Sequence, residues 1–173
     1  MKVLAKVLLL MVVLSLGANL AMADPDPCSA TAAVTCTVDP IIEWAAPSFA
    51  TIAIPNITAR GDTPSASQSL VLYTNCDLDI TADHSTAAQL TKTTDTLVTE
   101  YKLEYDGDGD PDTGGATVDW TDYATFIPVG SAVTHYPLDG AVNVTLSARA
   151  SNEAGTLADA GNYTATQTLT ATF

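Results

Sequence analysis

The stretch Val-Thr-Glu-Tyr-Lys-Leu-Glu-Tyr, residues 98–105, indicates the fold class most clearly. Its aromatic and leucine side chains, Tyr101, Leu103 and Tyr105, alternate with the charged side chains of Glu100, Lys102 and Glu104. A period of two is typical of a β-strand that buries one side and exposes the other. We therefore expect a half-buried strand over residues 98–105.

The same period recurs along the chain, and no stripe of apolar residues at helical spacing appears. The other predicted strands cover residues 30–38, 41–44, 49–58, 70–80, 117–120, 125–129, 141–150 and 163–173. Pro55 suits an edge strand or a bulge, and residues 60–67 read as a loop. Eight or nine strands separated by turn residues predict an all-β fold, an antiparallel immunoglobulin-like β-sandwich.

The N-terminus has the three parts of a secretory signal peptide. Lys2 and Lys6 precede an apolar run from Val7 to Leu16, and Ala21-Met22-Ala23 forms a small-residue cleavage site. The run is shorter than the roughly 20 residues that cross a bilayer, so we expect no membrane insertion; an uncleaved anchor is the competing interpretation. The predicted organisation is a signal peptide at 1–23, an N-terminal segment at 24–38 and one β-domain at 39–173. The predicted location is secreted, extracellular or cell-surface.

The predicted mature chain is strongly acidic. Without Lys2 and Lys6 it keeps 4 basic and 20 acidic residues, a net charge of −16. Such a surface repels nucleic-acid backbones and anionic lipid headgroups and attracts small cations. The charge excludes nucleic-acid partners; it serves either cation binding or solubility.

All three cysteines, Cys28, Cys36 and Cys76, lie in the predicted mature part, in an oxidising compartment. Cys36 and Cys76 both fall on the apolar parity of predicted strands, which favours a Cys36–Cys76 disulfide between strands. Cys28 would then be free or pair between subunits, although it could instead bond to either of the others.

Alternating carboxylates mark the region after residue 105: Asp106, Asp108, Asp110 and Asp112. Calcium loops use carboxylates at such spacing. The sixth position is Pro111 and the twelfth is Thr117, so the segment is not an EF-hand. Two interpretations remain open, a calcium-binding hairpin loop and a polar turn.

The sequence predicts no enzyme. His84 and His135 are the only histidines, and neither belongs to a catalytic triad or to a zinc-ligand spacing. Both are expected to be exposed to solvent. Trp44 and Trp120 could stack on a carbohydrate, but tryptophan in a β-sandwich is more often part of the core.

The tail from Asp159 to Phe173 carries a Gly161-Asn162-Tyr163 turn and then alternates apolar residues with threonine. It resembles the closing strand of exported structural families: fimbrial subunits, spore-coat-U type domains and the bacterial WxL cell-surface domain. The resemblance covers about 15 residues and implies export and assembly into a surface structure. Neither Trp44-Ala45-Ala46 nor Trp120-Thr121-Asp122 is a Trp-x-Leu motif, which argues against WxL-type binding.

The first mature stretch, Ser29–Val38, is itself an alternating strand of small apolar residues. It either forms the first strand of its own sheet or pairs with a neighbouring subunit by β-augmentation. The leading hypothesis is a secreted structural subunit of a filament, pilus-like fibre or surface layer. Its assembly residues would be Ala30, Ala32, Val34, Val38, Tyr163, Leu169 and Phe173. The rival is a monomeric calcium-dependent or carbohydrate-binding module.

Overall fold

The structure, a computed structural model, describes residues 29–105, 116–135, 140–152 and 156–173. The chain divides into two units, Met1–Val38 and Asp39–Phe173. Each is described here by itself.

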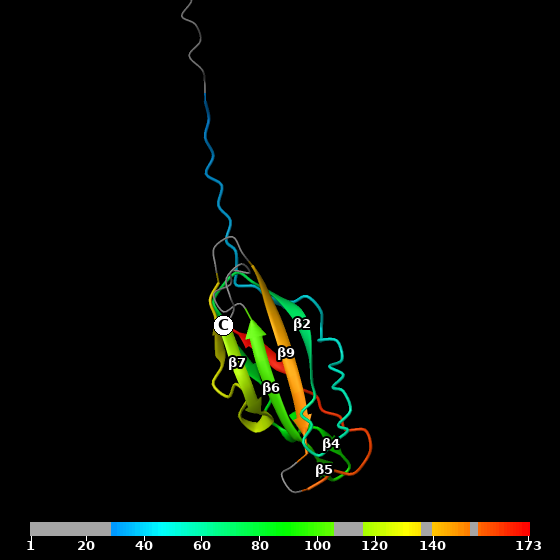
Figure 1. The fold of residues 1–173 in the computed structure, drawn as a ribbon. Helices are drawn as coiled ribbons and strands as arrows, with labels where there is room; N and C mark the ends of the chain where they lie inside the picture. The colour runs from blue at the N-terminus through cyan, green and yellow to red at the C-terminus, as the bar shows by residue number, and fades with distance from the viewer. Residues whose placement is uncertain (1–28, 106–115, 136–139, 153–155) are drawn as a thin grey trace, which may run out of the picture. The chain divides into compact units, whose positions relative to one another are not determined.

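The larger unit contains a five-stranded antiparallel sheet (Figure 1). Its strands follow the order β1 (Ile42–Trp44), β2 (Ser65–Thr74), β9 (Ala141–Ser151), β6 (Val98–Tyr105) and β7 (Ala116–Asp122). The strand expected over residues 98–105 is confirmed with those bounds, and it lies between β9 and β7. The long alternating stretches of the sequence therefore form the middle of this sheet.

The second sheet has three antiparallel strands, in the order β10 (Leu169–Thr172), β3 (Leu78–Ala82) and β8 (Ser131–Val133). A short ladder joins β4 (Thr91–Lys92) to β5 (Asp95–Thr96), and η1 (Thr86–Ala88) and η2 (Tyr123–Thr125) are single 3₁₀ turns. The described ranges contain no α-helix, and none of their helices is long and apolar enough to cross a membrane. The expected all-β antiparallel class is confirmed.

Both sheets bury side chains in one hydrophobic core. Leu72, Leu103 and Val144 come from the five-stranded sheet, and Ile80 and Val133 come from the three-stranded sheet. Each of these side chains is at most 1% exposed. Because alternate residues of a strand point to the same side, the apolar parity of each strand determines which side faces this shared core.

The prediction of one strand through residues 70–80 was wrong, because the chain bends at Asn75–Cys76. The Asn75 side chain accepts from the Ile41 N–H at 2.7 Å and donates to the Asp39 carbonyl at 3.0 Å. These bonds satisfy polar groups that a continuous ladder would otherwise pair. As a result β2 and β3 enter different sheets.

Two further boundaries differ from expectation. β2 begins at Ser65, inside the predicted loop at 60–67, because residues from Ser65 onward pair with β9. Residues 125–129, expected as a strand, form the end of η2 and a bend. Phe126 is fully buried there, and Ile127 has a φ of 50°. Burial of Phe126 thus overrides the β propensity of this segment.

The described part of the smaller unit, Ser29–Val38, contains no strand, contrary to expectation. Every residue in it is exposed, Val34 to 90% and Val38 to 71%. A strand exists only when a neighbouring strand pairs with its peptide groups, and alternation in the sequence does not supply one.

The expected Cys36–Cys76 disulfide is not formed. Cys36 is an exposed free thiol, and Cys76 is a partly buried free thiol. Cys76 lies in the bend between β2 and β3, where Thr74 Oγ1 is 3.7 Å from its sulfur. The expected strand position of Cys76 is therefore wrong as well.

Candidate functional site

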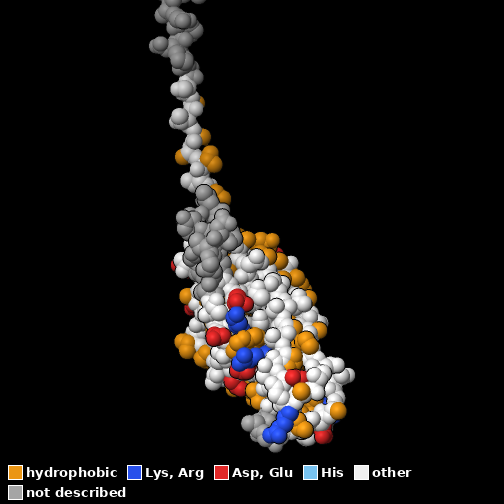
Figure 2. Space-filling model, in the orientation of Figure 1, with side chains coloured by type: hydrophobic (Ala, Val, Ile, Leu, Met, Phe, Trp, Pro, Cys, Tyr) orange, Lys and Arg blue, Asp and Glu red, His pale blue; other side chains and the backbone are white. Residues whose placement is uncertain are grey.

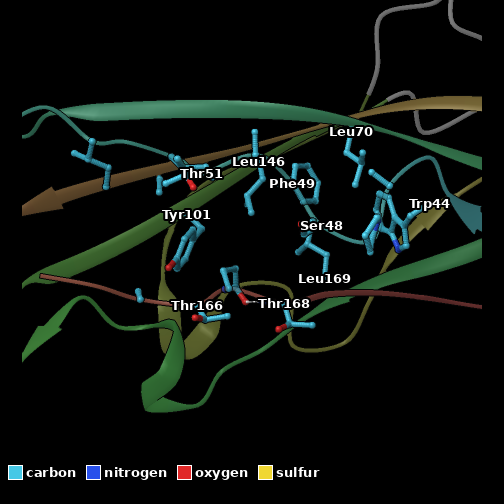
Figure 3. A pocket seen from close by; sticks show the side chains of 18 of the residues that line it. Trp44, Ser48, Phe49, Thr51, Leu70, Tyr101, Leu146, Thr166, Thr168 and Leu169 are labelled. Atoms are coloured by element: carbon cyan, nitrogen blue, oxygen red, sulfur yellow. Dashed lines mark hydrogen bonds between the residues drawn. The ribbon is translucent and has the colours of Figure 1, made fainter.

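The described residues form an apolar groove of about 450 Å³ (Figure 3). One wall is the extended segment from Trp44 to Ile54, and the other is residues 165–169. Leu70 and Leu146 point from the five-stranded sheet toward the wall that carries Thr166 and Thr168. Side chains of the shared core therefore form the inner side of the groove.

The first wall has side chains that pack on the core but a backbone that pairs with no other strand. Phe49, Ile52 and Ile54 are partly buried against the core, and the Phe49 ring lies 5.8 Å from that of Trp44. Within the described residues, no backbone-to-backbone hydrogen bond involves residues 46–54. The strand expected at 49–58 is therefore absent; Pro47 and Pro55 each lack an N–H that a ladder would need.

The second wall leads into β10, the edge strand of the three-stranded sheet. Asp83 N–H donates to the Thr168 carbonyl at 2.9 Å, and Thr166 N–H donates to the Ala87 carbonyl at 2.7 Å. Pairing toward β3 therefore uses Thr168 and, by alternation, every second residue after it. The intervening residues, including Leu169, direct their N–H and C=O groups to the open edge.

Buried side chains of β6 and β9 form the floor. Leu146 and Ala148 are 3% and 5% exposed, and Tyr101 is 4% exposed. The Tyr101 hydroxyl donates to the Ala88 carbonyl at 2.7 Å. Burial disfavours the phenolate and raises the Tyr101 pKa to about 12, and the negative charge of Asp83 adds to the effect. The floor thus offers an uncharged, largely apolar surface.

The outer side of the five-stranded sheet is different in chemistry. Figure 2 shows charged side chains gathered over its middle strands. Arg149 forms a two-bond pair with Glu100, at 2.7 and 3.0 Å, and its guanidinium carbon lies 4.7 Å from the centre of the Trp120 ring. Lys102 pairs with Glu104 at 2.8 Å.

Each tryptophan ring already contacts another side chain. The guanidinium of Arg149 already occupies one face of Trp120. Trp44 lines the groove and packs against Phe49. A carbohydrate that stacked on that face of Trp120 would first have to displace Arg149.

The predicted calcium ligands, Asp106, Asp108, Asp110 and Asp112, lie outside the described residues. Elsewhere, in the described segments, no three His, Cys, Asp or Glu side chains are grouped as a metal site would require. The calcium hypothesis stays a prediction.

The two histidines were expected to be exposed to solvent, but both are partly buried. His84 Nε2 lies 2.8 Å from the Phe126 carbonyl, so the ring helps to hold the bend that buries Phe126. The His135 N–H donates to Asp77 Oδ1 at 2.8 Å. Both contacts are structural: they join distant parts of the chain.

The predicted assembly residues separate into two groups. Ala30, Ala32, Val34 and Val38 lie in the exposed segment, and Tyr163, Leu169 and Phe173 lie at the other end of the chain. Leu169 lines the groove. The Tyr163 hydroxyl donates to Asp95 Oδ2 at 3.1 Å and to the Asp159 carbonyl at 2.9 Å, while Phe173 is 75% exposed beyond β10.

The sequence matches no protein-family model, and no curated protein is significantly similar to it.

Sequence reasoning missed the groove itself. Tyr101 and Leu146 were expected only on the apolar sides of the strands at 98–105 and 141–150. One signal was available, because Pro47 and Pro55 bracket the segment that forms the first wall. Two prolines at such spacing argue against a fully paired strand and for an unpaired wall.

Proposed function

We propose that this protein is a secreted, non-enzymatic structural subunit that assembles with copies of itself into a filament, pilus-like fibre or surface layer. Its domain is an immunoglobulin-like sandwich, and assembly proceeds by β-strand exchange or edge pairing. The signal-peptide pattern and the acidic composition support export. The resemblance of the closing strand to exported structural families supports the same class.

One observation carries the proposal: the domain has an unpaired sheet edge beside an open apolar groove. Exposed edges and exposed apolar surface both favour association with another chain. Soluble monomers normally cover or charge such edges. Leu169, which lines the groove, and Ala171 are apolar, and the residues that alternate with them are threonines (Thr168, Thr170 and Thr172).

The chemistry of the described residues gives no support to an enzyme. The polar groups around the groove are the hydroxyls of Ser48 and of the threonines, the Gln167 amide, the Trp44 indole N–H and the phenol of Tyr101. No histidine lines the groove: the two histidines of the described chain lie elsewhere, in structural contacts. An apolar groove without a nucleophile and base at hydrogen-bond distance fits binding better than catalysis.

The test is assembly of the purified mature protein, residues 24–173, with and without calcium. Size-exclusion chromatography and negative-stain electron microscopy should show a ladder of oligomers or regular filaments. Deletion of residues 24–38 should abolish polymers and leave a compact domain. A clean monomer under both conditions would contradict the proposal and favour the monomeric binding module.

A further inference from the structure

We propose that the groove is the acceptor for Ser29–Val38 of a second copy of this chain, which enters as an added strand along the edge of β10. The inference rests on the proposed function and adds which two surfaces form the joint. The donor belongs to the smaller unit of one copy, and the acceptor lies wholly within the larger unit of the next.

The backbone supplies the first argument. β10 is paired on one side only, with β3, so the peptide groups of Leu169 and Ala171 face the open edge. The opposite wall, residues 46–54, has no backbone-to-backbone hydrogen bond within the described chain. Ser29–Val38 is also unpaired and exposed throughout. An added strand satisfies groups on both sides of the joint.

The side chains supply the second argument. Even-numbered donor residues are apolar (Ala30, Ala32, Val34, Cys36, Val38), while the odd-numbered ones are serine, threonine or alanine. A strand with this period turns one apolar row into the groove and leaves the other row toward solvent. The apolar row is small, which suits a groove whose floor includes Leu146 and the ring of Tyr101 and whose first wall carries the ring of Phe49.

The dimensions agree with a short strand. The wall Ala165–Leu169 opposes about five extended residues, which span roughly 16 Å. About two or three of these would point inward, so the centre of the donor matters most. Val34 occupies that centre and is 90% exposed when unpaired.

The donor segment carries almost no charge, which allows it to bind a highly acidic partner. Ser29–Val38 contains no ionisable residue except the Cys36 thiol, whereas the whole chain carries 20 acidic residues and 6 basic ones. An uncharged segment enters the groove of another acidic copy without added repulsion or the cost of burying a charge.

Two pairs of matched variants of the mature protein test the joint. On the donor, Val34→Asp places a charge on the inward row, and Thr35→Asp places the same charge on the outward row. On the acceptor, Ala165→Phe fills the groove, and Thr164→Phe places the same ring on an adjacent exposed position. Far-UV circular dichroism and thermal unfolding establish that all four variants are folded.

We expect Val34→Asp to raise the dissociation constant of the joint by roughly 100-fold or more, because the change removes an apolar contact and buries a carboxylate. Ala165→Phe should also give monomers. Thr35→Asp and Thr164→Phe should still assemble. In sedimentation velocity, the first two variants run as monomers and the last two as a ladder.

Mixing is the decisive experiment. The Val34→Asp variant keeps its groove, and the Ala165→Phe variant keeps its donor, so together they can form one joint and no more. The mixture should give a one-to-one heterodimer, in which labelling of the Cys36 thiol of the Ala165→Phe copy is lost. A mixture that stays monomeric, with both proteins folded, overturns the inference.

The outcomes separate this inference from the proposed function. If the unmodified protein assembles and Val34→Asp assembles equally well, the joint is wrong while the structural-subunit proposal stands. If the unmodified protein stays monomeric at all concentrations, both fail. If its Cys36 is protected in the monomer, the segment fills the groove of its own chain, which contradicts exchange between copies.

Discussion

Removing the hydroxyl of Tyr101 tests the chemistry of the groove floor. In the native protein this hydroxyl donates to the Ala88 carbonyl at 2.7 Å, beneath the surface of the groove. Tyr101→Phe keeps the ring and leaves that carbonyl without its side-chain partner. At pH 8 we expect a loss of about 1–2 kcal/mol in the free energy of unfolding.

The pH dependence gives a sharper measurement. The Tyr101 pKa is raised from 10.0 to about 12 in the folded protein, chiefly by burial. A raised pKa means that the folded state favours the protonated form, so the associated stability is complete below pH 10 and is lost as the pH rises through 12. Between pH 9 and pH 11 the linkage amounts to about 1.3 kcal/mol, which solvent screening reduces to roughly 1 kcal/mol.

The assay is urea unfolding of the monomeric fraction at pH 8, 9, 10 and 11. The native protein should lose roughly 1 kcal/mol more than Tyr101→Phe between pH 9 and pH 11, so the two become nearly equal in stability at the upper end. Tyr73→Phe is the control, because Tyr73 is 47% exposed. Equal alkaline losses in the native protein and Tyr101→Phe would refute the assignment of a buried, hydrogen-bonded phenol.

Three other variants probe the frame of the site by denaturant unfolding. Leu103→Ala deletes a fully buried side chain and should lower the free energy of unfolding by about 2–5 kcal/mol. Leu157→Ala, at a 67% exposed position, should change it by no more than about 0.5 kcal/mol. Equal losses in the two variants would contradict the placement of Leu103 in the core. Arg149→Lys loses the two-bond pair with Glu100 and should lower the free energy of unfolding by about 0.5–1 kcal/mol. In a protein that already carries Glu100→Gln, the same substitution should have little effect if the pair is the source of the loss. Gly130→Ala should cost about 1 kcal/mol or more, because Gly130 has a φ of 94°; an unchanged midpoint would show that this turn tolerates a side chain.

Strand prediction succeeded where both sides of a strand have clear and different chemistry. The alternation over residues 98–105 matches β6, and the stretch at 141–150 lies within β9. It failed where an alternating segment has no neighbouring strand to pair with, as in Ser29–Val38 and residues 49–58. Side-chain parity is local, but pairing requires another strand at the correct distance and register.

The candidate site was only partly within reach of the sequence. The assembly role expected for Leu169 stays a prediction. The groove that Leu169 lines depends on strands and extended segments that are distant along the chain. The expected strand position of Cys76 also failed for a tertiary reason. Cys76 has apolar parity, but the bend at Asn75 removes it from any strand.

The sequence by itself determined the all-β class, the acidic charge and the apolar rows of the central strands, because these depend on composition and on a period of two. The tertiary structure alone decided that β2 and β3 part at Asn75 to enter different sheets, and that the edge of β10 lies beside an unpaired wall. Such features arise from hydrogen bonds and packing between segments far apart in the chain, which no local pattern records. The open groove is the result of that long-range arrangement.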